Sequence, residues 1–148
     1  METLGNSFRK KEESFGSGKN IWHEIKGAYP CGGKITNISD FVSQGVIPSG
    51  SMCQFDQVKN EIKIIKSAEI KLTDGGGEVE PNTIKGLLQN DVYVKSDTTF
   101  ATGSVVFAGE IYSDRCAEKI PAEVFAALPM IVPIREKADD GVLSQRKR

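Results

Sequence analysis

Histidine and cysteine are scarce in this sequence, and their scarcity limits its chemistry. The 148 residues contain one histidine, His23, and three cysteines, Cys31, Cys53 and Cys116, at wide spacings and without a Cys-x-x-Cys pair. A Cys/His zinc site needs several closely spaced ligands, and a disulfide framework needs paired cysteines. We therefore expect no metal, no cofactor and no disulfide framework, and the pattern favours folding in a reducing cytoplasm.

Long hydrophobic runs are also missing. The longest apolar stretch is "VFAALPMIVPI", which contains two prolines and is roughly half as long as a membrane-spanning helix. The first residues contain no apolar run that follows basic residues, so no signal peptide is expected. The sequence predicts a soluble protein that does not contact a membrane.

The chain has no large excess of charge of either sign. It contains 19 Lys and Arg against 20 Asp and Glu, and its pI is about 5.9. This balance gives no electrostatic reason to expect a nucleic-acid partner. Residues 1–26 and 135–148 are slightly basic, and the region between them is acidic. These charged ends lack periodic apolar residues, which predicts either solvated tails or arms that become ordered on a partner.

Short strand-like runs separated by Gly, Pro, Asn and Asp dominate the sequence after Gly32. Ile62 and Ile64 are separated by a lysine, which is the spacing of a strand with one wet face. The strongest strand signal is "ATGSVVFAGEIY", in which Gly109 indicates a bulge or a close backbone approach. The glycines of "TDGGGEVEPNT", residues 73–83, predict a long flexible loop.

One short helix is predicted near the C-terminus, within "IPAEVFAALP". Pro121 suits the first helical position, and Pro129 ends the helix. The fold class is therefore mainly β: a single small β-sandwich or barrel-like domain with one short helix near the C-terminus and an extended N-terminal arm. The predicted boundaries are residues 1–30 for the arm, 31–135 for the β-rich domain and 136–148 for the charged tail.

No catalytic residue is predicted. Ser49 and Ser51 in "GVIPSGSMCQFD" lack the flanking glycines of a nucleophile elbow. A thiol enzyme that uses Cys53 or Cys116 with His23 remains a separate hypothesis, and it requires a reactive thiol of low pKa.

Aromatic residues in the polar N-terminal region are candidates for partner contacts. Phe8, Trp22 and Tyr29 lie where no core is evident from the sequence, and His23 is next to Trp22. Aromatic side chains in a segment that does not fold alone are suited to docking on another chain. The alternative is that Trp22 and Tyr29 pack on their own β domain.

Four segments occur in an order that resembles a known family. They are "GVIPSGSMCQFDQVKNEIKIIKSAEI", "IKGLLQNDVYV", "GSVVFAGEIY" and "IPAEVFAALPMIVPIRE", within residues 45–136. Their series is similar to the head fibre and head decoration proteins of tailed bacteriophages, especially those of the crAss-like group and other gut phages. The resemblance identifies five residues as markers of the fold: Pro48, Gly50, Gly86, Asp91 and Gly109.

The resemblance implies a non-enzymatic structural protein of the virion, located on the capsid surface after synthesis in the host cytoplasm. Residues 31–135 would form the capsid-decoration domain. The implied partners are the major capsid protein, further copies of the chain itself in a trimer rather than a dimer, and another head fibre protein. An alternative function is a virion-displayed module that binds a glycan or the host surface.

Overall fold

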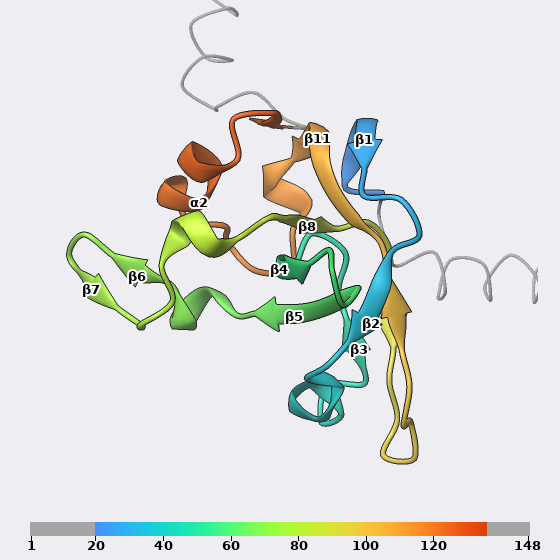
Figure 1. Cartoon of the computed structure of the whole chain (residues 1–148). Helices are drawn as coiled ribbons and strands as arrows, with labels where there is room; N and C mark the ends of the chain where they lie inside the picture. Colours follow the sequence, from blue (N-terminus) through green and yellow to red (C-terminus); the bar gives the residue numbers. More distant parts are fainter. Residues whose placement is uncertain (1–19, 136–148) are drawn as a thin grey trace, which may run out of the picture.

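The predicted strands assemble into a curled sheet in the computed structural model, which describes residues 20–135 (Figure 1). The main sheet contains β1 (Trp22–Ala28), β2 (Gly33–Ile35), β4 (Met52–Asp56), β5 (Glu61–Ile65), β8 (Gly86–Leu88), β10 (Thr102–Gly103), β11 (Val105–Tyr112) and β12 (Ile131–Ile134). Two small ribbons pair β3 (Val46–Ile47) with β9 (Val92–Tyr93) and β6 (Lys71–Leu72) with β7 (Gly75–Gly76). The described residues also contain the α-helix α2 (Ala122–Ala127). Short 3₁₀ helices, labelled η, are η1 (Ile38–Phe41), η2 (Ser67–Glu69), η3 (Pro81–Thr83) and η4 (Ser113–Arg115).

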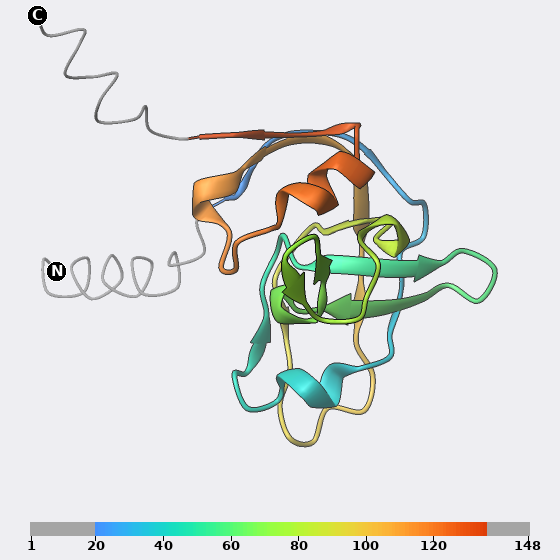
Figure 2. The same cartoon turned by 90° about the vertical axis from the view of Figure 1, so that its left-hand side faces the viewer.

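The strand order explains why the sheet curls. It runs β1-β11-β8-β4-β5-β2-β10, and only Ser104 separates β10 from β11 along the chain. The path from β11 to β10 must therefore curve back on itself, and Figures 1 and 2 show the resulting half-barrel. β12 pairs with β11 in parallel, at the opposite end of β11 from the β8 pairing. The prediction of a mainly β, barrel-like domain with one short helix near the C-terminus is confirmed.

The β4–β5 hairpin shows how the apolar spacing produces a strand. Ile62 and Ile64 are fully buried, whereas Lys63 between them is exposed. At the turn of the hairpin, Asp56 Oδ1 accepts a hydrogen bond from the Val58 amide at 3.0 Å. The expected alternation is therefore confirmed from Ile62 to Ile64, whereas Ile65, the last residue of β5, is also buried.

Consecutive apolar residues in the central strands fill two cores on opposite faces of the sheet. In each of four pairs, one residue packs with Trp22 and Val124 in the first core, and the other packs with Phe41 and Ile47 in the second core. The pairs are Met52 and Cys53, Ile65 and Ile64, Leu87 and Leu88, and Val106 and Val105. Because neighbouring side chains on a strand point to opposite faces, these doublets indicate that the middle of the sheet is covered on both sides.

The predicted boundary of the arm at residue 30 is wrong. Residues Trp22–Ala28 form β1, which pairs antiparallel with β11, and the Tyr112 amide donates to the Ile21 carbonyl at 2.7 Å. The β1–β11 register is interrupted at three places, so the sequence of β1 lacks the regular alternation that identifies a strand. Residues 1–19 and the predicted tail, 136–148, lie outside the described residues.

The predicted loop at residues 73–83 is more regular than expected. Gly75 and Gly76 form β7, the second strand of the β6–β7 hairpin, and have φ values of +129° and +104°. The segment then makes a bridge from Val79 to Ile70 and enters η3. Repeated glycine therefore marks a tight hairpin here rather than a long irregular loop.

The helix α2 lies close to its predicted position. Pro121 is the N-cap residue, one position before the first helical position that the sequence predicted for it. Val124 and Leu128 are buried in the first core, and the partly buried Phe125 packs against that core. Within residues 20–135, no helix has both the length and the apolar character needed to cross a membrane.

Candidate functional site

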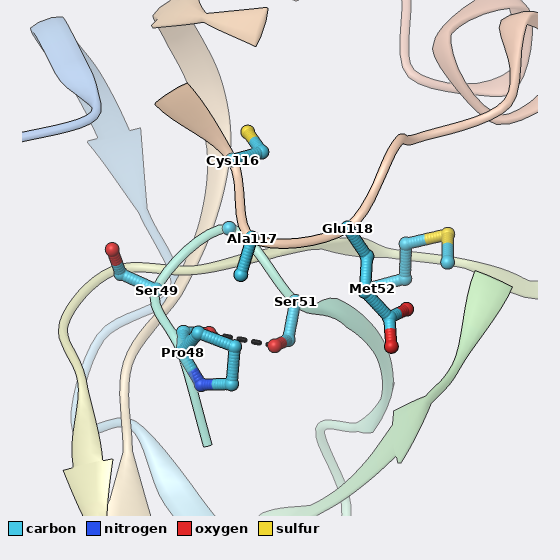
Figure 3. Close-up of a pocket in the computed structure, with 8 residues that line it drawn as sticks. Pro48, Ser49, Ser51, Met52, Cys116, Ala117 and Glu118 are labelled. Atoms are coloured by element: carbon cyan, nitrogen blue, oxygen red, sulfur yellow. Dashed lines mark hydrogen bonds between the residues drawn. The ribbon is translucent and has the colours of Figure 1, made fainter. Parts of the chain in front are cut away.

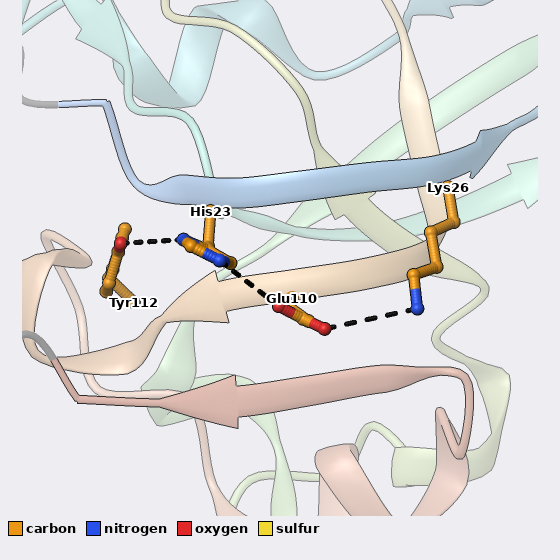
Figure 4. Close-up of polar contacts among 4 residues, drawn as sticks. All are labelled: His23, Lys26, Glu110 and Tyr112. Carbon is orange, nitrogen blue, oxygen red and sulfur yellow. Dashed lines mark hydrogen bonds and ion pairs between the residues drawn. The ribbon is translucent and has the colours of Figure 1, made fainter.

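Irregular pairing between β1 and β11 brings four polar side chains together on the surface (Figure 4). Trp22 is opposite Ile111 and Glu24 is opposite Glu110, so His23 is an extra residue in β1. Lys26 is a second extra residue, between the paired positions Ile25 and Gly27. Bulges of this kind redirect side chains, and both His23 and Lys26 approach the Glu110 carboxylate.

The contacts in this cluster are open to solvent. His23 Nδ1 and Tyr112 Oη share a hydrogen bond of 2.8 Å, and His23 Nε2 lies 3.6 Å from Glu110 Oε2. Lys26 Nζ lies 4.0 Å from Glu110 Oε1. Exposed ion pairs contribute only about 0–1 kcal/mol to stability. The cluster therefore contributes little to the fold, and its polar groups could exchange these weak contacts for contacts with a partner.

Trp22 packs on its own β domain, as in the alternative that the sequence left open, and does not present its ring to a partner. Its side chain is buried in the first core, with an exposed fraction of 5%, and its Nε1 donates to the Gln89 carbonyl at 3.0 Å. A buried indole offers no surface to a partner, so the predicted contact role is corrected to a core role. The burial of Trp22 could not be predicted from its polar neighbours in sequence, because the other residues of its core come from strands far along the chain.

The other predicted contact residues fall into three classes. Tyr29 is half-buried, and its ring packs against Phe55 and Phe107 with centroid separations of 4.9 Å each. His23 is exposed and remains available for contact. Phe8 lies outside the described residues.

The Pro48–Gly50 turn is hydrogen-bonded to the end of β8 and to the segment that follows β8. The Gly50 amide donates to the Leu88 carbonyl at 2.8 Å, and Asp91 Oδ1 accepts from the Ser49 amide at 2.7 Å. Ser51 Oγ donates to the Pro48 carbonyl at 2.6 Å, a bond drawn in Figure 3. The serine hydroxyl therefore closes a turn, and the marker Asp91 joins two segments of the family-like series.

The backbone conformation favours glycine at position 50, and a side chain there would also displace the end of the Ile21 side chain. The φ of Gly50 is +86°, a backbone conformation that residues with a side chain rarely adopt. A Cβ atom there would lie 2.7 Å from Ile21 Cδ1 and 3.3 Å from Cys116 Sγ. Beside this turn is a cavity of about 20 Å³, lined by residues 48–52 and 116–118 (Figure 3). That volume suits one water molecule and not an organic substrate.

The markers Gly86 and Gly109 allow neighbouring backbones to approach closely. A Cβ on Gly86 would lie 2.4 Å from the Val106 carbonyl oxygen. A Cβ on Gly109 would lie 2.5 Å from the Glu24 carbonyl oxygen. The close approach indicated by the sequence at Gly109 is therefore confirmed, and both glycines have structural roles.

The structure does not join the candidate thiols to His23. Cys53 is fully buried and its Sγ donates to the Ser51 carbonyl at 3.4 Å, whereas Cys116 Sγ donates to the Tyr112 carbonyl at 3.7 Å. Burial raises the pKa of the Cys53 thiol far above its ordinary range. Burial, with a smaller effect from the Asp114 carboxylate, raises the pKa of Cys116 to about 11. Neither environment favours a thiolate at neutral pH.

Alkylation should therefore distinguish the three cysteines. At pH 7.5, iodoacetamide is expected to modify the exposed Cys31 first, while the native protein protects Cys53 and Cys116. Intact mass measured over time should show a single adduct that persists, and three adducts in denaturant serve as the control. Rapid modification of Cys53 or Cys116 in the native protein would contradict the protection and favour the thiol-enzyme hypothesis.

Several surface residues had no distinctive signal in the sequence. Lys26, Glu110 and Tyr112 became candidates only when β1 and β11 paired. Tyr93 and Phe100 are both exposed. They lie on either side of the polar run "KSDTT", and this run is the feature of the sequence from which a projecting turn could have been predicted.

The candidate surface thus consists of the polar cluster on β1 and β11 and of two exposed rings elsewhere on the domain. Within residues 20–135, no three His, Cys, Asp or Glu side chains are grouped so that they could hold a metal ion. No protein-family model, curated protein or solved structure matches this chain.

Proposed function

We propose that this chain is a head fibre or head decoration protein, which binds the major capsid protein on the outer surface of a tailed-phage capsid. The observation that carries the proposal is the ordered series of family-like segments within residues 45–136. Those segments supply β4, β5, β8, β11, α2 and β12, which are neighbours in the structure. The series therefore describes one packed unit rather than unrelated turns and strands.

Two of the marker residues support this interpretation because they join segments of the series to one another. Asp91 bonds to the turn that precedes β4, and Gly86 lies against the backbone of β11. Either residue would be difficult to replace without separating two segments, as expected if the series specifies a common scaffold. Gly109 instead lies against β1, outside the series.

A small domain of this kind suits attachment to a repeating surface. Its central strands are buried on both faces, which provides a rigid body. Many copies on a symmetric lattice turn weak individual contacts into strong retention, and association of the chain into a trimer would add to that effect. The proposal requires no catalytic residue.

Residues 1–19 are proposed to supply contacts to the capsid. This segment contains Phe8 and several basic residues. It leads into Asn20, whose carbonyl accepts from Arg115 Nη1 at 2.6 Å, and then into the buried Ile21 and Trp22. An arm attached at this point would be firmly joined to the domain.

Deletion of residues 1–19 should separate capsid binding from folding. We expect the full-length chain to co-sediment with capsids assembled from the major capsid protein of the same phage, and the shortened chain to remain in the supernatant. The melting temperature should be nearly unchanged, because the deletion ends before β1. A deletion of residues 1–26 would be a poorer test, since it would remove Trp22 and much of β1.

Deletion of residues 136–148 is the matched control, because it removes a charged end that also lies outside the described domain. Its expected result is normal sedimentation with capsids. If the chain lacking residues 1–19 still binds fully, the proposed role of the arm is wrong. If the full-length chain does not bind these capsids at all, the decoration function itself is wrong.

A further inference from the structure

Two aromatic rings project from one turn of the domain. We call residues 92–101 the aromatic finger. Tyr93 and Phe100 have exposed fractions of 74% and 61%. Between them the chain reverses direction, because the Thr98 amide donates to the Lys95 carbonyl at 3.0 Å and Thr98 Oγ1 accepts from the Lys95 amide at 2.8 Å. The turn therefore spans residues 95–98. Tyr93 lies on the chain segment, or arm, that enters it and Phe100 on the arm that leaves it, each at the same separation from the turn.

Packing at the base of the finger fixes this exposure. Val94 and Ala101 are buried in the second core, one on each arm. Tyr93 pairs with Val46 in the β3–β9 ribbon, and the Val94 amide donates to the Gly45 carbonyl at 3.0 Å. Since side chains alternate along extended arms, burial of Val94 and Ala101 directs Tyr93 and Phe100 outward.

The surroundings of the rings are polar and nearly balanced in charge. Lys34 Nζ lies 5.6 Å from the centroid of the Phe100 ring, which is within reach of a cation–π contact. The turn between the rings contains one basic, one acidic and three hydroxyl side chains: Lys95, Asp97, Ser96, Thr98 and Thr99. The finger therefore combines exposed apolar faces with a rim of hydrogen-bonding groups.

We propose that the aromatic finger is a binding site for a neutral carbohydrate. A sugar ring presents C–H groups on its faces and hydroxyl groups around its edge. The faces of Tyr93 and Phe100 would pack against the C–H groups, while the hydroxyl, carboxylate and ammonium groups of the finger would bond to the sugar hydroxyls. This assignment gives a role to both exposed rings and to the polar side chains between them.

The size and charge of the finger favour a sugar over a macromolecule. A stable protein interface uses roughly 20–30 residues on each side, which is far more than this turn provides. Nucleic-acid binding needs a basic patch or stripe, whereas Lys34 and Lys95 are accompanied by Asp97. A small uncharged ligand that packs on one or both of the exposed rings fits the finger best.

The finger projects from one end of the domain. Figures 1 and 2 show it at the end of the domain opposite β12, in the gold colour of residues near 100. The carbohydrate site is inferred from the residues of the finger alone. The presence of many such sites on one surface depends on the proposed capsid function. In such an array, weak binding of each finger would add up to useful avidity.

A glycan array tests this proposal with the full-length chain coupled to fluorescent beads. The printed probes are neutral glycans that end in mannose, glucose, galactose, fucose, N-acetylglucosamine or N-acetylgalactosamine, together with their sialylated counterparts. We expect binding to at least one neutral group. Tyr93→Ala and Phe100→Ala should each weaken that binding by about ten-fold or more, whereas Tyr93→Phe should retain most of it.

Val58→Ala is the control, because Val58 is 93% exposed in the β4–β5 turn and lies outside the finger. Its binding should equal that of the unmodified chain. Silence across the neutral glycans, binding to sialylated glycans alone, or full binding by both alanine variants would each overturn the proposal. Capsid co-sedimentation of the two alanine variants should be unchanged, so failure of the carbohydrate site and failure of the decoration function give different results.

Discussion

Replacing Gly86 with alanine is expected to lower the free energy of unfolding by about 3 kcal/mol, at the upper end of the usual cost of overpacking. The new Cβ would lie 2.4 Å from the Val106 carbonyl oxygen and 2.6 Å from Val105 Cγ1. Chemical denaturation followed by circular dichroism would measure the change. Domains of this size are stabilised by only about 5–15 kcal/mol in total, so one methyl group should have a large effect.

The position of β8 prevents easy relief of this clash. Gly86 is opposite Cys53 in the β4–β8 pairing, and Leu87 is opposite both Met52 in β4 and Val106 in β11. Movement of β8 away from β11 would therefore compress it against β4. The atom nearest to the new methyl group is also a backbone oxygen, which cannot avoid contact by changing a rotamer.

Gly45→Ala is the matched control for Gly86→Ala. Gly45 has a φ of +76°, but a Cβ there would meet nothing within 4 Å. Its expected cost is only that of the left-handed backbone conformation, about 1 kcal/mol. If the two variants lose the same small amount of stability, β8 can shift to accept the methyl group and the close approach is not a strict requirement.

The elements that sequence reasoning located are those whose signals are local. Pro48 and Gly50 predict a turn by their own backbone preferences, and Ile62 and Ile64 predict a strand by their spacing. The apolar doublets, such as Leu87 with Leu88, carry further information because they require a strand covered on both faces. The curling of the sheet depends on the order of strands far apart in sequence, and no local pattern specifies that order.

The candidate site was less predictable than the fold for the same reason. His23 contacts Tyr112, which is 89 residues away in sequence. Bulges in β1 also removed the alternation that would have identified its buried residues. Tyr93 lies in β9 and Phe100 lies two residues before β10, and aromatic residues in or beside strands are usually expected to be buried. Tyr93 and Phe100 therefore became candidates only when the structure showed which residues of the finger face the core.

The second large effect is expected from Trp22→Ala, at about 3–5 kcal/mol. The substitution would leave a large cavity in the first core beside Ile111, the strand partner of Trp22, and the Gln89 carbonyl would lose its indole donor. Because Trp22 is the first residue of β1, detachment of this strand from β11 should accompany the loss. Denaturation followed by circular dichroism measures stability in this variant, which lacks the single tryptophan of the chain.

Comparison with His23→Ala separates a core role from a contact role on the same strand. His23 is exposed, so its removal should cost at most about 1 kcal/mol of stability. If His23 belongs to the capsid-contacting surface, that variant should sediment less with capsids while its melting temperature stays nearly the same. Trp22→Phe should recover part of the stability lost in Trp22→Ala, because a ring refills the core. A stable Trp22→Ala protein that no longer binds capsids would instead restore the contact role of the indole, and would mean that β1 leaves β11 when the protein docks.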